Sequence, residues 1–361
     1  MAKLISGFFL VLVLSYLSER VDGKPTSSRK TLEDVDRKLK LLNKPAVNSI
    51  KSEDGDIIDC VDIYKQPAFD HPALKNHTIQ LKPSFDLPQE KLTTKNEQVF
   101  QIWQRSGSCP EGTIPIRRIR REDLLRAASL DDFGRKPPQI SSASNRTDRF
   151  VYFNNTEHSL GPIENRSVNP LLYGDTRTRV FTYWTTDAYR KTGCFDLTCS
   201  GFVQTSRKYA LGAAFPNISS EFGPQYYLPV GIYKDPQSSN WWLKYNNDIS
   251  IGYWPAESLM VYLKHSSTLV EWGGEVYSPN VKKTPHTKTA MGSGNFASPC
   301  FIYNARIIDF SDKTVKYPQW VGTWTDEIFC YTAYNYVKGN GNGSSYPVFY
   351  FGGPGQNPNC P

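Results

Sequence analysis

The chain has 361 residues, of which 21% are charged, and a formal net charge of +7 at pH 7. This length is enough for two domains with sizeable cores. The positive charge is modest for the length, and the basic clusters at residues 38–44 and 117–121 lack the interleaved aromatic residues of a nucleic-acid groove. We therefore expect these clusters to be solvated faces or processing-prone segments, and we expect no nucleic-acid partner.

Residues 1–23 have the features of a secretory signal peptide. A short apolar run at residues 5–16 follows Lys3 and precedes polar residues and Gly23. About 18 apolar residues are needed to cross a bilayer, so this run predicts a cleaved signal rather than an anchor. No later stretch is apolar enough to span, and we expect a secreted protein with no membrane contact after the signal is removed.

Sequons and cysteines both indicate a glycosylating, oxidising compartment. The six Asn-x-Ser/Thr sequons are at Asn76, Asn145, Asn154, Asn165, Asn217 and Asn342. Proximity among the seven cysteines favours the disulfide Cys194–Cys199, with Cys60–Cys109 and Cys330–Cys360 as the next pairings and Cys300 left over. No cysteine pair has the tight spacing that zinc requires, so we expect no metal and no cofactor.

Residues 24–129 combine helical and strand patterns. From Thr31, apolar residues recur at helical spacing until Pro45 ends the run. Further expected elements are a short helix before Gly107, a helix at residues 121–129 and a strand at residues 56–64. Together they predict a small α/β domain.

Residues 130–148 have the composition of a linker, with Pro137-Pro138, several serines and the basic pair Arg135-Lys136 as a candidate processing site.

Beyond the linker, residues 149–361 contain short aromatic or β-branched segments bounded by turn residues. The expected strands are 180–184, 201–206, 226–233, 241–245, 249–254, 269–277, 301–310, 328–337 and 346–351. Such a series without intervening helices predicts an all-β domain built as an antiparallel β-sandwich.

Familiar hydrolase motifs are absent from the sequence. There is no His-Glu-x-x-His, no Gly-x-Ser-x-Gly elbow, no phosphate-cradling loop and no Asp-Thr-Gly. Cys300 could in principle form a catalytic thiol dyad with His265 or His286. We expect it instead to be a free or structural thiol, because no helix terminus near it would activate the thiol. Carboxylate chemistry remains, in which one acid stays protonated while another accepts a proton from water.

Glu275 is the leading candidate for such an acid. It follows Gly273-Gly274 in an expected half-buried strand, and paired glycines there indicate a bulge or a close approach. Glu271 is about 13 Å away along an extended strand, too far to share one water. The second acid is expected among Glu164, Glu221, Glu257 and Glu327. A surface glutamate on a bulged strand is the alternative interpretation of Glu275.

Nine segments resemble the plant neprosin family of exported glutamic peptidases. Residues 59–69 (DCVDIYKQPAF) and 109–118 (CPEGTIPIRR) are similar to the motifs of its activation peptide. Matches to its catalytic domain are FTYW at 181–184, TGC at 192–194, GFVQ at 201–204, GYWP at 252–255, EWGGE at 271–275, MGSG at 291–294 and FGGPG at 351–355.

The resemblance implies cleavage of peptide bonds near proline, at low pH, by two glutamates and an activated water. It assigns Glu275 as one of the pair. The other falls on Glu164, although Asn165-Arg166-Ser167 replaces the Ala-Gly-Trp that follows the family's glutamate. The stretch from Phe150 to Glu164 is also shorter than the family's.

The sequence therefore predicts a secreted zymogen, located in the apoplast or cell wall or in the vacuole. It does not give the oligomeric state, for which we favour a monomer. The expected zymogen has an activation peptide (24–129), a linker (130–148) and a β-sandwich peptidase domain (149–361) acting on proline-containing peptides. Ring faces that we expect to contact substrate are those of Trp241, Trp242, Trp254 and Trp272. The alternative is a sandwich without catalysis that binds proline-rich peptide or cell-wall polysaccharide.

Overall fold

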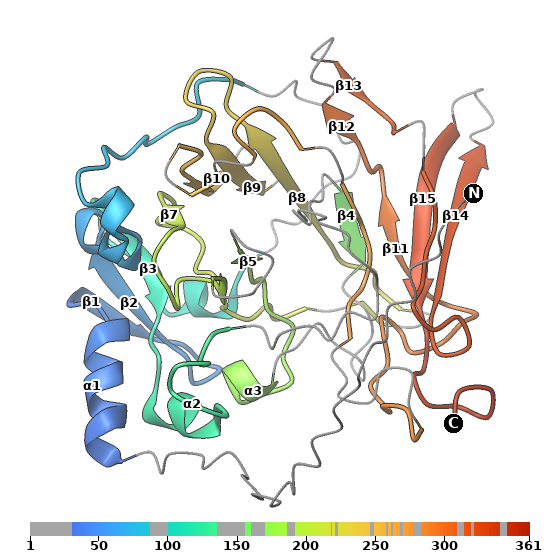
Figure 1. Cartoon of the computed structure of the whole chain (residues 1–361), viewed down its shortest axis with the longest axis horizontal. Coiled ribbons are helices and arrows are strands. Elements are labelled where there is room, and N and C mark those ends of the chain that lie inside the picture. The colour runs from blue at the N-terminus through green and yellow to red at the C-terminus, as the bar shows by residue number, and fades with distance from the viewer. Residues whose placement is uncertain are drawn as a thin grey trace, which may run out of the picture.

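The computed structural model describes residues 31–86, 100–135, 156–159, 170–185, 192–217, 219–220, 223–245, 249–257, 259–260, 263–267, 270–276, 284–308, 314–318, 321–339 and 345–361. Its strands pair antiparallel throughout, and helices are few (Figure 1). Within this part of the chain, no helix has the length and apolar character needed to cross a membrane.

The N-terminal region is a small α/β unit. Helix α1 (Leu32–Leu42) begins where the Thr31 side chain accepts a hydrogen bond from the Asp34 amide, as an N-cap does. The strands β1 (Ala46–Lys51), β2 (Ile57–Asp62) and β3 (Thr113–Arg117) form an antiparallel sheet in that order, followed by α2 (Arg121–Arg126). Four short 3₁₀ helices are at Ile63–Lys65, Pro67–Asp70, Pro72–Leu74 and Ile102–Arg105. The prediction of an α/β unit at this end is confirmed.

An eight-stranded antiparallel sheet is the largest element of the remaining described residues. Its order is β14-β15-β11-β4-β8-β9-β10-β7. The strands are β4 (Thr156–Ser159), β7 (Val203–Gln204), β8 (Tyr227–Lys234), β9 (Trp241–Tyr245), β10 (Ile249–Trp254), β11 (Cys300–Tyr303), β14 (Thr332–Gly339) and β15 (Ser345–Gly352). The smaller elements are α3 (Pro170–Tyr173), the pair β5 (Tyr183–Trp184) and β6 (Cys194–Phe195), and the pair β12 (Ile307–Ile308) and β13 (Val315–Lys316). The predicted all-β antiparallel class is confirmed.

Strand β4 was not expected from the sequence. It pairs with β11 on one side and β8 on the other, so it lies in the interior of the sheet. Its sequence, Thr-Glu-His-Ser, has neither the apolar run nor the β-branched content that identifies a buried strand. The strand is therefore defined by its neighbours and not by local propensity.

One face of β8–β10 is covered by the N-terminal region. Tyr233, Trp242 and Tyr253 are directly opposite one another across the three strands. His77 makes a 2.7 Å hydrogen bond to the Tyr253 hydroxyl, and the Phe85 ring lies 6.1 Å from the Tyr233 ring. The N-terminal region and the large sheet thus share a hydrophobic core, which also contains Ile63, Ala68, Leu74, Ile79 and Ile114 from the former.

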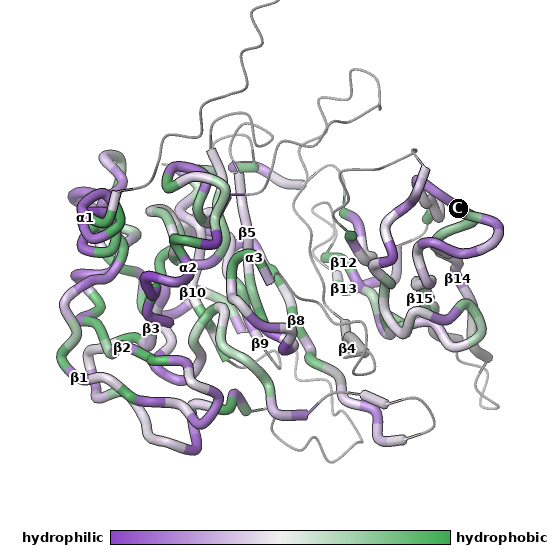
Figure 2. Tube along the Cα trace, turned by 90° about the horizontal axis from the view of Figure 1, so that it is seen from below, coloured by the Kyte–Doolittle hydropathy of each residue, from purple (hydrophilic) through white to green (hydrophobic). Residues whose placement is uncertain are grey.

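The opposite face of β9 and β10 packs against later parts of the chain. Tyr245 meets Tyr209 edge to face with ring centroids 5.1 Å apart, and Trp254 meets Phe202 at 4.7 Å. Both views of the molecule place α1, α2 and β1–β3 beside β8–β10 and away from β14 and β15 (Figures 1 and 2). The N-terminal region therefore covers one end of the sheet only.

The first residues of the expected linker are packed and not loose. Phe133 is buried in a second shared cluster with Leu124, Leu172 and Phe195, and the Phe195 amide donates to the Gly134 carbonyl at 2.8 Å. Lys136 and the rest of the expected linker lie outside the described residues. The candidate cut after Arg135 therefore comes immediately after the packed residues Phe133 and Gly134 in the sequence.

Candidate functional site

The segment that carries Glu275 is not the regular strand that we expected at residues 269–277. In its described part, 270–276, only Glu271 forms a bridge and the other residues have no strand pairing. A Cβ at Gly274 would lie 2.7 Å from both the Phe351 ring and the Met291 sulfur. The backbone thus passes directly over the Phe351 side chain of β15, and Gly274 marks a close approach, one of the two alternatives predicted for the glycine pair.

The Glu275 carboxylate is exposed and oriented by a phenol. Its Oε2 accepts a hydrogen bond from the Tyr183 hydroxyl at 2.9 Å. The burial that we expected for an acid in a cleft is therefore not present in the full chain. Sequence reasoning missed Tyr183, although it lies in the Phe-Thr-Tyr-Trp motif that carried part of the resemblance.

The candidates for a second acid are dispersed. Glu164 and Glu221 lie outside the described residues. Glu257 is exposed and pairs with Lys264 at 3.5 Å, and Glu327 hydrogen-bonds the buried His286. Glu164 stays a prediction as the partner of Glu275.

Three of the four tryptophans expected at the substrate site lie in the core. Trp241, Trp242 and Trp254 are buried, and Trp272 is half-buried. The Trp241 indole donates to the Leu263 carbonyl at 3.0 Å. The indole N–H groups of Trp242, Trp254 and Trp272 are buried without an acceptor in the described structure. Contact between these rings and a substrate stays a prediction.

Asp235, at the turn between β8 and β9, anchors the segment that covers the sheet. Its carboxylate accepts from the Ser84 amide and hydroxyl, both at 2.6 Å, and from the Gln80 side chain at 2.8 Å. Burial by itself raises the pKa of Asp235, but the hydrogen bonds from Ser84, Ser238 and Gln80 outweigh it and lower the pKa to about 2. The sequence indicated only a turn at Asp235-Pro236.

A buried ion cluster joins the two regions. Asp56 pairs with Arg117 at 3.1 Å and with Arg179 at 2.5 Å, and all three side chains are at most 4% exposed. Burial alone lowers the pKa of Arg179, but Asp175 and Asp56 raise it overall. The expectation that the basic cluster at residues 117–121 is a solvated face is therefore wrong for Arg117.

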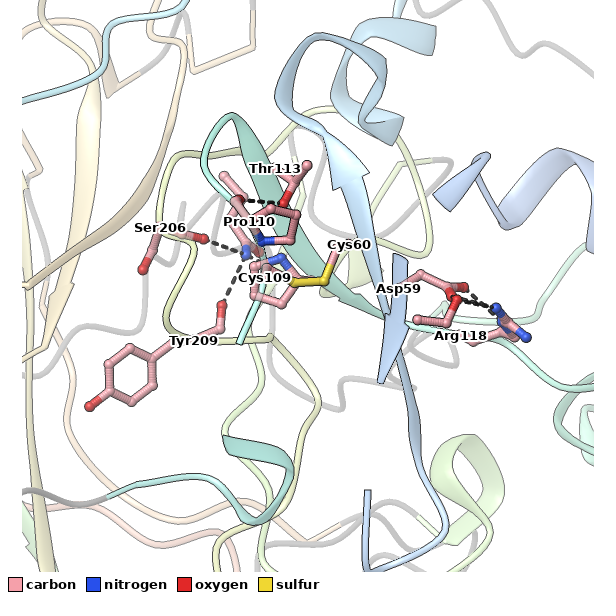
Figure 3. Close-up of a disulfide and its surroundings, with 11 residues drawn as sticks. Asp59, Cys60, Cys109, Pro110, Thr113, Arg118, Ser206 and Tyr209 are labelled. Atoms are coloured by element: carbon pink, nitrogen blue, oxygen red, sulfur yellow. Dashed lines mark hydrogen bonds and ion pairs between the residues drawn. A yellow bond between two sulfur atoms is a disulfide. The ribbon is translucent and has the colours of Figure 1, made fainter. Parts of the chain in front are cut away.

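The structure contains the three disulfides expected from the spacing, Cys60–Cys109, Cys194–Cys199 and Cys330–Cys360, and Cys300 is a buried free cysteine. The Cys60–Cys109 disulfide ties β2 to the segment before β3, close to the hydrogen bond from Thr113 to the Pro110 carbonyl and to the Asp59–Arg118 pair (Figure 3).

Of the sequons, Asn76 and Asn217 are exposed, as glycosylation requires, and the other four lie outside the described residues.

A single group in the described part of the chain has the spacing of metal ligands. His286, Cys330 and Cys360 place their ligand atoms within 4.8 Å of one another. The two sulfurs are joined in a disulfide, and His286 bonds Glu327 through Nε2. The group therefore has no thiolate to offer a metal.

Comparison with protein families divides the chain between residues 161 and 164, after β4 and before α3. Residues 49–161 match the Neprosin activation peptide, and residues 164–354, more than half of the chain, match Neprosin. The second match contains the exposed Glu275 and its partner Tyr183. It also contains the strand pair β5–β6, which carries Tyr183, and β15, over which Gly274 passes. The chain belongs to the neprosin family.

Proposed function

We propose that this protein is the latent precursor of a peptidase that hydrolyses peptide bonds with Glu275 as its water-activating group. The carboxylate of the Trp-Gly-Gly-Glu motif is held by Tyr183 at an exposed position that a polypeptide can reach. That single observation carries the proposal. Family membership supports it, because both a catalytic and an activation segment are matched.

The chemistry requires two acids with different protonation. Glu275 takes a proton from water, the resulting hydroxide attacks the peptide carbonyl, and a protonated acid gives its proton to the departing amine. We assign the acid role to Glu164. Since one member must be ionised and the other protonated, activity belongs to mildly acidic conditions.

Approach of the second acid and of substrate must supply the burial that Glu275 lacks. Closing a site removes water and strengthens the electrostatic interactions inside it. We propose a preference for bonds near proline, which rests on the family resemblance and on the aromatic rings of the sheet.

Latency is supported by the contacts of residues 77–85. These residues cover the aromatic row Tyr233–Trp242–Tyr253 and are anchored at Asp235. A polypeptide cannot reach that face while they are in place. Activation therefore requires a cut that lets the N-terminal region leave.

Strand β4 limits where this cut falls. A cut after residue 159 removes a strand from the interior of the sheet, whereas a cut after any residue from 135 to 155 leaves β4 with the mature domain. We expect N-terminal sequencing of the processed form to begin within 136–156. A mature chain that begins beyond Ser159 contradicts this.

The decisive experiment incubates the full chain at acid pH and then offers a proline-containing peptide. Glu275→Gln is expected to abolish hydrolysis, whereas the matched control Glu257→Gln, an exposed glutamate paired with Lys264, retains it. Glu164→Gln tests the second acid in the same assay, and replacing the substrate proline by alanine tests specificity. Undiminished hydrolysis in Glu275→Gln overturns the proposal.

A second candidate function is a binding module without catalysis, for proline-rich peptide or cell-wall polysaccharide. The partners of the described candidate acids favour it, since Glu257 pairs with Lys264 and Glu327 hydrogen-bonds His286. Ligand binding that is equal in wild type and Glu275→Gln, with no turnover in either, supports this function.

We also propose that the protein is exported. Three disulfides support an oxidising destination, and the exposed sequons support glycosylation on the way. A mobility shift on treatment of the expressed protein with an N-glycosidase tests this.

A further inference from the structure

Tyr183 lies on a short hairpin that several independent contacts hold. Strand β5 pairs with β6 so that Tyr183 is opposite Phe195 and Trp184 is opposite Cys194. The Cys194–Cys199 disulfide closes the loop that follows β6. The backbone at Tyr183 is therefore fixed on one side by pairing with a cross-linked segment.

A buried aspartate fixes the residue before Tyr183. Asp196 accepts a hydrogen bond from the Thr182 amide at 2.9 Å, and its own amide donates to the Thr182 carbonyl at 2.7 Å. The Tyr173 hydroxyl donates to the other Asp196 oxygen at 2.6 Å. Both backbone groups of Thr182 are thus held by one residue.

The Tyr183 ring is also packed. Its centroid lies 5.2 Å from that of Phe195 and 6.4 Å from that of Phe181. A ring held by two others, on a backbone held by Asp196, presents its hydroxyl in one direction. Such support by neighbouring contacts is what positions a functional group to within a fraction of an ångström.

Glu275 itself lies in a different backbone setting. It follows two glycines in a segment with little strand pairing, and its side chain is exposed. An exposed glutamate samples several rotamers, and fixing one conformation of such a long side chain costs entropy. A donor in a fixed place selects the rotamer whose Oε2 it reaches.

We propose that Tyr183 is a positioning residue for Glu275. Its hydroxyl donates to Oε2, which directs Oε1 and its lone pairs toward the attacking water. The inference rests on the proposed function for its catalytic meaning, but the bond and the orientation do not depend on it.

The first test is kinetic, on the acid-treated full chain. Tyr183→Phe keeps the ring and its packing and removes only the hydroxyl. We expect kcat to fall about ten- to a hundredfold, the scale on which misplacement of a reacting group acts, with KM changed less than about twofold. The matched control is Tyr334→Phe, an exposed tyrosine stacked on Tyr350 with centroids 5.2 Å apart, which should leave both constants unchanged.

The second test needs no activity. The side-chain carboxyl carbon of Glu275 is observed by ¹³C NMR in the uncut chain, assigned by its loss in Glu275→Gln. Its resonance should move in Tyr183→Phe and stay in Tyr334→Phe.

An unmoved resonance together with an unchanged kcat overturns the role of Tyr183. If the resonance moves in Tyr183→Phe but the wild-type protein shows no Glu275-dependent hydrolysis, the orienting role of Tyr183 stands and the proposed function is overturned. The two failures are therefore distinguishable. Equal thermal midpoints for the wild type and both phenylalanine variants show that a loss of kcat is not a loss of folding.

Discussion

The two ends of the eight-stranded sheet differ in what covers them. At β8–β10, the aromatic face lies under residues 77–85 and belongs to a core shared with the N-terminal region. At β14–β15, Tyr334 and Tyr336 are exposed, and the preceding segment exposes Ile328 and Phe329. We call the β8–β10 end the covered end and the β14–β15 end the uncovered end, because among the described residues the N-terminal region packs only on the former.

The candidate site bridges these two ends. Gly274 crosses over Phe351 of β15, at the uncovered end, and Glu275 follows it. Tyr183 is next to Trp184, which belongs to the core shared with the N-terminal region. The bond between Tyr183 and Glu275 therefore joins a residue beside the shared core to the segment that lies over β15.

The largest effect is expected from Asp56→Asn, which breaks the covered end. The substitution leaves Arg117 and Arg179 buried with one counter-charge fewer. Removal of one partner from a buried ion pair costs about 3–5 kcal/mol, because an uncompensated charge remains. Denaturant unfolding of the full chain measures this loss.

The control for Asp56→Asn is Glu53→Gln, in the exposed pair with Arg105 at 3.5 Å. Exposed pairs contribute at most about 1 kcal/mol. Equal stability of the two variants would contradict the view that the buried cluster holds the regions together.

A smaller loss is expected from Gly274→Ala, which breaks the uncovered end. The new methyl group meets the Phe351 ring and the Met291 sulfur at 2.7 Å, so the segment must shift. Overpacking of this kind costs about 1–3 kcal/mol. Because Glu275 is the next residue, we also expect the NMR resonance of its carboxyl carbon to move.

Gly322→Ala is the matched control, since a Cβ there has no atom within 4 Å. Its stability should stay within about 0.5 kcal/mol of wild type. A loss in Gly322→Ala equal to that in Gly274→Ala would show that contact with β15 does not decide the effect.

The contrast between the two ends also explains what the sequence predicts well. Strands β9 and β10 were predicted with the observed bounds, because aromatic or β-branched residues make up most of each of them. Strand β14 begins at Thr332, four residues later than expected, since the apolar residues Ile328 and Phe329 form a turn with exposed side chains.

Long-range pairing explains what the sequence could not predict at the site. Glu275 was identified from its motif, but its contact with Tyr183 joins residues 92 positions apart. The burial of Arg117 depends in the same way on Asp56, 61 positions away. Local periodicity contains no information about either partner.

Acid pH is expected to act on the covered end through Asp235. Its pKa of about 2 lies below the ordinary 3.8, so the folded state favours the carboxylate. The stabilisation is present above about pH 3.8 and is lost as the pH falls through 2. Asp235→Asn should therefore be less stable than wild type at pH 5, with a smaller further loss between pH 4 and pH 2. Thermal midpoints across this range measure it, and identical profiles would contradict the anchoring role of Asp235.

Asp196 should give a still smaller effect of opposite sign. Burial raises its pKa from 3.8 to about 6, against the lowering effect of the hydrogen bonds from Tyr173 and Thr182. The folded state therefore holds the proton more tightly, and the stabilisation is full below about pH 3.8 and is lost as the pH rises through 6. Asp196→Asn keeps an oxygen for the Thr182 amide and cannot ionise, so its midpoint should change less than that of wild type between pH 4 and pH 6.5. The exposed Asp86→Asn should follow the wild-type profile. If Asp196→Asn does so too, the carboxyl group is not the source of the pH dependence, and the geometry around Thr182 depends on packing alone.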